Sequence, residues 1–132
     1  MSGSGGAAGI THVVTIDADL SKNGGGPTPA GFAGGFAPLA ASVAVGDGVR
    51  FANSDGFAHT ASAIAGTTFP SAYPFDASAL TARGAALSSG FTSGSIAVGA
   101  TSETFVADRA GTYLYGCFYH YGSPMRAEIV VQ

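Results

Sequence analysis

Three side chains that bind soft metal ions lie close together near the C-terminal end of the sequence. Cys117 is followed by His120 and then by Met125. Gly122 and Pro124 favour a tight turn between the last two of them. The spacing therefore predicts that a thiolate, an imidazole and a thioether share one loop, which can close around a single ion.

The chemistry of these donors favours copper. Sulfur and imidazole ligands select copper over hard cations, and two histidines with one cysteine and a weak axial methionine form the type 1, or blue, copper arrangement. A second histidine is needed, and the sequence offers His12 and His59. His59 follows a polar turn between two predicted strands, whereas His12 lies within a strand-like run. We therefore predict His59 as the remaining metal ligand, with His12 as the only substitute.

Other uses of the same residues fit less well. A cysteine nucleophile with a histidine base needs a lowered thiol pKa and substrate access, and it leaves Met125 unexplained. Multicopper and type 2 enzyme sites need more histidines than the three in this chain. A structural zinc site ordinarily takes four Cys or His ligands. A protein that carries or stores copper uses the same ligands, so it remains open as an alternative function.

Short runs of alternating apolar residues indicate the elements that position these side chains. Their composition is typical of strands, and glycine-containing turns separate them. The predicted strands cover residues 10–16, 41–45, 49–52, 104–107, 112–117 and 127–131. We predict an all-β fold, an antiparallel sandwich of two sheets, for residues 10–132 as a single domain.

Two stretches rich in glycine and proline interrupt the strand pattern. Residues 20–35 and 66–90 are predicted to be loops, since Pro70 and Pro74 exclude a regular strand from the second. Asp76 is a suitable N-cap for a short helix over residues 76–83. We expect the second loop to cover the edge of a sheet.

Composition narrows the function classes. The chain has 132 residues, of which 46% are hydrophobic and only 10% charged, with a formal net charge of -3. Its five Lys and Arg residues are scattered singly, which argues against nucleic acid as a partner. No apolar run approaches the length of a membrane span. Residues 1–9 are typical of a flexible linker or an expression remnant, and an export signal or membrane anchor belonging to a longer precursor is compatible with them.

Over residues 41–132 the sequence resembles the cupredoxin family, in particular its plastocyanin-like and pseudoazurin-like members. The resemblance rests on one upstream histidine, His59, followed by the pattern C-x2-H-x4-M that starts at Cys117. It implies a Greek-key β-sandwich with one type 1 copper ion, held by His59, Cys117, His120 and Met125. It further implies an electron carrier, rather than an enzyme, that cycles between Cu(I) and Cu(II).

The resemblance also implies roles for residues around the ligands. The N–H group of Thr60 is expected to donate to the cysteine sulfur, and the carbonyl of Ala58 to lie near a fifth position. Many relatives have an asparagine where Thr60 stands, and its side chain ties the two ligand loops together. Photosynthetic plastocyanins have a surface tyrosine where Gly116 stands. Without that tyrosine, electrons are expected to pass through the exposed edge of His120.

An apolar docking surface is expected around that edge. Its predicted members are Phe57, Tyr121, Gly122 and Pro124, a surface suited to brief redox encounters. The expected partner is a redox protein such as a cytochrome, an oxidase or a reductase, and the chain itself is expected to be a monomer. The usual setting of the family implies a periplasmic or extracellular location.

Overall fold

Alternating burial explains the strands at the centre of the molecule. We describe the chain from a computed structural model, which covers residue 10 and residues 12–132. In β6 (Gly48–Asn53), Val49 and Phe51 are buried, whereas Arg50 between them is exposed. Successive side chains of a strand point to opposite faces, so this pattern gives β6 one face toward a core.

Within the described residues, the strands form two four-stranded sheets and a two-stranded ribbon. The first sheet has the order β4-β1-β6-β8 and the second the order β5-β10-β9-β7. The bounds in the first sheet are β4 (Phe36–Ala37), β1 (Val13–Ala18), β6 and β8 (Phe105–Val106). Those in the second are β5 (Ala40–Val43), β10 (Arg126–Val131), β9 (Gly111–Gly116) and β7 (Ser62–Ile64). The ribbon pairs β2 (Gly26–Thr28) with β3 (Gly31–Ala33).

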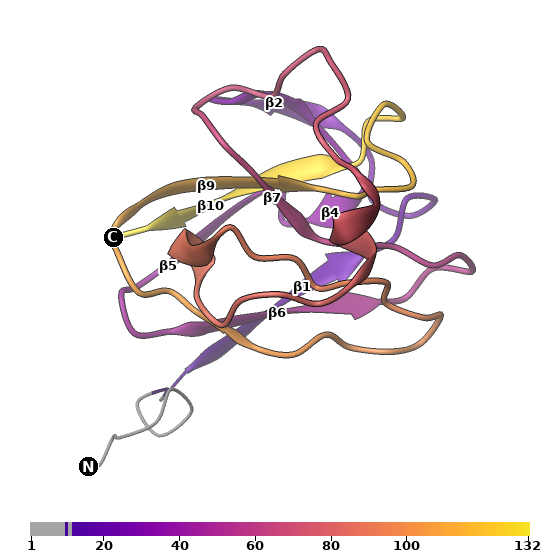
Figure 1. Cartoon of the computed structure of the whole chain (residues 1–132). Coiled ribbons are helices and arrows are strands. Elements are labelled where there is room, and N and C mark those ends of the chain that lie inside the picture. Colours follow the sequence, from indigo (N-terminus) through magenta and orange to yellow (C-terminus); the bar gives the residue numbers. More distant parts are fainter. Residues whose placement is uncertain (1–9, 11) are drawn as a thin grey trace.

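The two sheets pack face to face as a sandwich. Figure 1 shows β9 and β10 in one layer and β1 and β6 in the other. Aromatic rings from both layers meet between them, with the Tyr115 ring centroid 4.8 Å from that of Phe36 and 5.1 Å from that of Phe51. Between the parallel partners β1 and β6 the chain passes through β5 of the other sheet, and between the parallel partners β5 and β10 it passes through β6 and β8. The predicted all-β, Greek-key sandwich is confirmed.

The predicted strands are present with shifted ends, and several short strands were not predicted. The run over residues 10–16 becomes β1, which begins at Val13 and extends to Ala18. Residues 20–35 were predicted to be a loop, which is wrong where β2 and β3 pair. Pro27 is tolerated in β2 because this ribbon has only two strands, so its missing N–H leaves no central ladder incomplete.

Part of the stretch over residues 66–90 lies along a sheet edge, since Ala86 forms a bridge with Val106 of the edge strand β8. The expected helix over residues 76–83 is reduced to a single 3-10 turn, η2 (Ala77–Leu80), whose cap Asp76 accepts a hydrogen bond from the Ser78 N–H. A second 3-10 turn, η3 (Leu87–Ser89), follows. Beyond it the chain returns along β7, where the Ala63 N–H donates to the Phe91 carbonyl at 2.8 Å.

Two further expectations concern the extent of the chain. The linker predicted for residues 1–9 lies outside the described residues, and the single domain over residues 10–132 stays a prediction. In the part of the chain that the structure describes, no helix has the length and apolar character needed to cross a membrane.

The sheet register brings three strand ends to one end of the sandwich. Gly116 at the end of β9 pairs with Arg126 at the start of β10 and with Ser62 at the start of β7. Because Cys117 directly follows β9 and Met125 directly precedes β10, both lie at this end. His59 lies between β6 and β7 and therefore approaches the same end from the other side.

Candidate metal centre

Each candidate ligand is held by backbone pairing next to a strand. His59 forms an isolated bridge with Ile96, in which the Ile96 N–H donates to the His59 carbonyl at 2.7 Å. The Cys117 N–H donates to the Met125 carbonyl at 2.9 Å, which closes the base of the loop that carries His120. These contacts fix the backbone of the site within the sandwich.

Three of the predicted ligands come together in space. The ligand atoms of His59, Cys117 and His120 all lie within 4.8 Å of one another. The Cys117 sulfur is 3.7 Å from Nδ1 of His59 and 3.7 Å from Nδ1 of His120. The two imidazole rings meet edge to face with centroids 5.0 Å apart. Two nitrogen donors and one sulfur therefore face a common point, an arrangement that can hold one metal ion.

Met125 is joined to this cluster through the backbone, since its carbonyl accepts from the Cys117 N–H. Its side chain is fully buried, and its backbone N–H donates to the Tyr121 carbonyl at 3.2 Å. The backbone of Gly35 passes directly against the Met125 side chain, so that a Cβ atom at this position would collide with it. Gly35 also has a φ of +75°, a conformation that favours glycine.

Thr60 links the two segments that carry the ligands. Its backbone N–H donates to the Cys117 sulfur at 3.4 Å, as the resemblance implied. Its hydroxyl oxygen accepts a hydrogen bond from the Phe118 N–H at 2.8 Å and also lies 3.0 Å from the Ser62 hydroxyl. A threonine therefore provides the side-chain tie that the resemblance assigns to asparagine in many relatives.

The titration of the metal-free site follows from burial. Burial raises the pKa of the Cys117 thiol, although hydrogen bonds from Thr60 and from the backbone of Tyr119 and His120 oppose the rise. Burial lowers the pKa of His120, and the nearby His59 contributes in the same direction. Both shifts favour neutral groups, and neutral imidazole is the form that binds a metal.

A buried carboxylate next to the cluster was not predicted. Oδ2 of Asp55 lies 2.8 Å from Nε2 of His59. Burial raises the pKa of Asp55, but hydrogen bonds from His59 and from the N–H groups of Gly56 and Leu20 outweigh it and lower the pKa to about 2. The sequence signal was an aspartate four residues before the histidine, which was interpreted only as part of a polar turn.

The predicted docking residues fall into two groups. Phe57 is 59% exposed, with its ring centroid 6.4 Å from that of His120, and Gly122 and Pro124 are at least partly exposed. Tyr121 was expected on this surface, but only 4% of it is exposed. Its ring packs in a small apolar cluster, and its hydroxyl donates to the Pro70 carbonyl at 2.5 Å.

Another aromatic side chain occupies the surface that Tyr121 was expected to share. Tyr119 is 44% exposed, and its ring centroid is 6.2 Å from that of His120. His12 lies outside the cluster, with its Nδ1 atom 3.6 Å from a carboxylate oxygen of Asp47. Ala58 is partly buried beside His59.

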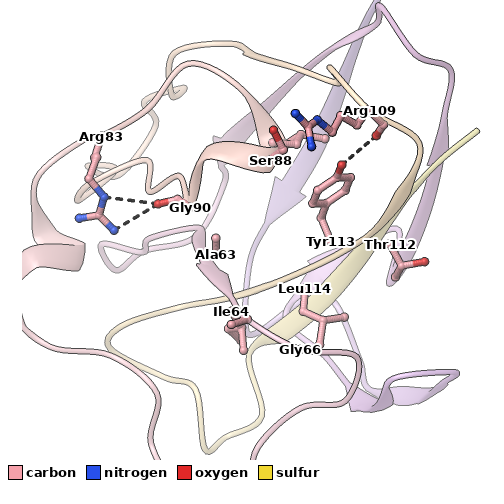
Figure 2. Close-up of a pocket in the computed structure, with 12 residues that line it drawn as sticks. Ala63, Ile64, Gly66, Arg83, Ser88, Gly90, Arg109, Thr112, Tyr113 and Leu114 are labelled. Atoms are coloured by element: carbon pink, nitrogen blue, oxygen red, sulfur yellow. Dashed lines mark hydrogen bonds between the residues drawn. The ribbon is translucent and has the colours of Figure 1, made fainter.

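A separate hollow of about 570 Å³ lies along β7, β9 and the segment around η3 (Figure 2). Two of its polar side chains donate to backbone carbonyls. Arg83 donates to the Gly90 carbonyl at 3.2 Å, and the Tyr113 hydroxyl donates to the Arg109 carbonyl at 2.8 Å. None of the candidate ligands lines this hollow.

Comparison with solved structures gives the class of fold. A purple cupredoxin from Nitrosopumilus maritimus superposes with a TM-score of 0.54 at 18% identity, over 90% of this chain and 99% of that chain. An amicyanin variant in the oxidised state gives 0.56 at 18% identity, over 99% and 92%. Auracyanin B gives 0.53 at 18% identity, over 93% and 90%. The chain has the cupredoxin fold.

The sequence alone gives no such match. No protein-family model matches it, and no curated protein matches it either. At 18% sequence identity these matches show the fold of the chain. The candidate metal site rests on the residues of this chain.

Proposed function

We propose that this chain is a single-site type 1 copper protein that carries electrons between redox partners. In this proposal one copper ion is held by His59, Cys117, His120 and Met125. The observation that carries the proposal is that Nδ1 of His59 and Nδ1 of His120 each lie 3.7 Å from the buried Cys117 sulfur. Two imidazoles, a thiolate and a nearby thioether are the ligand set of blue-copper sites.

The proposed ligands have separate roles. Copper, when bound, supplies a one-electron Cu(I)/Cu(II) couple. His59 and His120 provide the nitrogen donors, and Cys117 provides a thiolate in a short covalent bond. Met125 would provide a weak thioether contact that tunes the reduction potential, and the carbonyl of Ala58 would be a further oxygen donor beside the ion.

The contacts of Thr60 support electron transfer in particular. Its N–H group donates to the Cys117 sulfur, and its hydroxyl accepts from the Phe118 N–H, so it holds both ligand segments in place. Donors that keep their positions in both oxidation states allow electron exchange with little reorganisation. The buried environment of the site maintains this rigidity.

The exposure of the two histidines supports an exit through His120. His59 is fully buried, whereas His120 is partly exposed and lies between the exposed rings of Phe57 and Tyr119. We propose that a partner docks on a surface formed by Phe57, Tyr119, Gly122 and Pro124. Compared with the sequence-based prediction, Tyr119 replaces the buried Tyr121.

The partner in this proposal is a redox protein, such as a cytochrome, an oxidase or a reductase, that meets a monomer of this chain briefly. A periplasmic or extracellular location, including attachment to a membrane through a longer precursor, fits such a carrier. The role is not enzymatic. Burial of Cys117 and the raised pKa of its thiol are the reverse of what a cysteine nucleophile needs.

One experiment tests the central claim. Cu(II) is added to the purified metal-free protein, and the visible spectrum is recorded beside that of a Cys117→Ser variant. We expect an intense blue or green band from the thiolate in the parent and none in the variant. Absence of the band from the parent overturns the type 1 assignment.

A second measurement separates an electron carrier from a copper carrier or store. The rate of electron self-exchange is measured by NMR line broadening in mixtures of the Cu(I) and Cu(II) forms, and copper loss is followed with a competing chelator. Fast exchange with slow copper loss supports the electron carrier. Slow exchange with ready copper release favours the carrier of metal.

A further inference from the structure

The two ring nitrogens of His59 face different partners. Nδ1 lies 3.7 Å from the Cys117 sulfur, whereas Nε2 lies 2.8 Å from Oδ2 of Asp55. The side chains of His59 and Asp55 are 0% and 5% exposed. Water therefore does not compete for this contact, and the carboxylate is the fixed neighbour of the distal nitrogen.

The surroundings of Asp55 determine which of the two groups donates. The Leu20 N–H donates to Oδ2 at 2.8 Å, and the Gly56 N–H donates to Oδ1 at 2.7 Å. Both oxygens of Asp55 accept from backbone donors, and the same carboxyl group lies within hydrogen-bond distance of Nε2 of His59. A proton on Nε2 satisfies this contact and leaves a lone pair on Nδ1, the atom that faces the sulfur.

The backbone around Asp55 holds this geometry. The Asp55 N–H donates to Oδ1 of Asn53 at 2.9 Å. The Asn53 amide in turn donates to the carbonyls of Phe57 and Ile96 at 2.8 and 2.9 Å. Since Ile96 is also the backbone partner of His59, one network positions the carboxylate and the imidazole together.

We propose that Asp55 is a positioning residue of the copper site, whose contact with Nε2 of His59 fixes the ring orientation and holds its proton on Nε2, so that Nδ1 faces the metal. The inference rests on the proposed function for its redox consequence. A carboxylate behind a metal-bound histidine makes the imidazole a stronger donor. The stronger donor favours Cu(II) over Cu(I).

The test compares Asp55→Asn with Asp19→Asn in the full chain loaded with copper. Asp19 is a matched control, because its carboxylate is also buried and accepts from Ser21 and Lys22 N–H groups without touching His59. We expect Asp55→Asn to weaken Cu(II) binding about tenfold relative to Cu(I). This change corresponds to a rise in reduction potential of about 59 mV for one electron. Asp19→Asn should leave the potential close to that of the parent.

A spectroscopic readout follows the proton itself. In the diamagnetic Cu(I) protein and in the metal-free protein, ¹⁵N NMR of the His59 ring should show a proton on Nε2 that exchanges slowly with water. Asp55→Asn should speed this exchange, and Asp55→Glu, which keeps the charge, should restore part of the parent potential. A purely structural role for Asp55 predicts none of these differences.

The outcomes separate this inference from the proposed function. If the parent develops no thiolate band with Cu(II), the copper assignment fails, while the metal-free NMR spectrum still decides the state of His59. If the parent is blue or green and both asparagine variants have the same potential, the role of Asp55 is overturned. A proton on Nδ1 of His59 in the parent overturns it too, even if every variant misfolds.

Discussion

The two segments that carry the candidate ligands differ in burial and in how they are supported. The first ligand segment, residues 53–60, holds a fully buried His59 against a buried aspartate. The C-terminal ligand loop, residues 117–125, holds a partly exposed His120 beside exposed aromatic rings. We infer a difference in access: the first segment shields its histidine from solvent, whereas the C-terminal ligand loop carries the proposed exit for electrons, His120.

The largest expected effect comes from removing each histidine in turn, which tests whether the two ligand segments differ in access to solvent. His120→Gly should lose the type 1 spectrum and regain an intense band when imidazole is added, because the resulting gap opens toward solvent. His59→Gly should lose the spectrum without recovery, since its gap is enclosed. The measurement is visible absorption of the Cu(II) protein titrated with imidazole. Equal recovery in both variants would show that the two histidines are equally accessible.

A second prediction tests how Met125 is packed against a residue outside the C-terminal ligand loop. Gly35→Ala places a methyl group against the Met125 side chain at a φ of +75°. We expect a loss of about 2–4 kcal/mol in the free energy of unfolding, from left-handed strain together with overpacking. Urea denaturation of the metal-free protein measures it.

The matched control for this prediction is Gly90→Ala. Gly90 also has a positive φ, +69°, but an added Cβ atom meets open space. Its expected cost is therefore about 1–2 kcal/mol, from the backbone alone. If the two variants lose the same free energy, the contact between Gly35 and Met125 contributes nothing to stability.

A third prediction concerns the tie between the two segments. Thr60→Val keeps the shape of the side chain but removes the acceptor of the Phe118 N–H. Leaving this partly buried donor unpaired should cost about 1–3 kcal/mol of unfolding free energy, again measured in urea. Thr60→Ser retains the hydroxyl and should lose less. A valine variant as stable as the parent would mean that the segments are held together by other contacts.

The smallest expected effect is on docking. Phe57→Lys should slow electron exchange with a redox partner roughly two- to fivefold, because a charge at the edge of an interface acts mainly on association. The visible spectrum should stay the same. Val45→Lys is the control, since Val45 is similarly exposed but follows β5 at the opposite end of the sandwich. Stopped-flow kinetics with a cytochrome as a test partner would show whether only the first variant is slower.

How much of the site could be predicted depended on how local its determinants are. Cys117, His120 and Met125 lie on one short loop, so their spacing alone indicated a metal site. His59 could be chosen over His12 from its position after a polar turn. Both inferences needed only neighbouring residues along the chain.

Features that depend on distant contacts could not be predicted. The carboxylate of Asp55 is oriented in part by the N–H group of Leu20, which is far away in the sequence. Tyr121 turns inward because Ile64 and Leu114 form an apolar cluster beneath it. In the sequence alone, a tyrosine next to a ligand in a tight turn is equally compatible with the surface.

In the fold, too, the elements that depend on distant contacts were not predicted from the sequence. Strands of about six residues gave a clear alternation and were predicted to within a few residues of their ends. The missed strands are short, such as β3 (Gly31–Ala33) and β4 (Phe36–Ala37). A run of two or three residues shows no periodicity, so such strands exist only because a neighbouring strand pairs with them.

The burial of Cys117 also affects how readily the thiol is oxidised while the protein holds no metal. It is the sole cysteine of the chain, and none of its surface is exposed. Peroxide attacks accessible thiolates, and disulfide-linked dimers need two thiols that can meet. The folded, metal-free protein is therefore protected from sulfenic acid formation and from covalent dimerisation, and its thiol is kept reduced for the next copper ion.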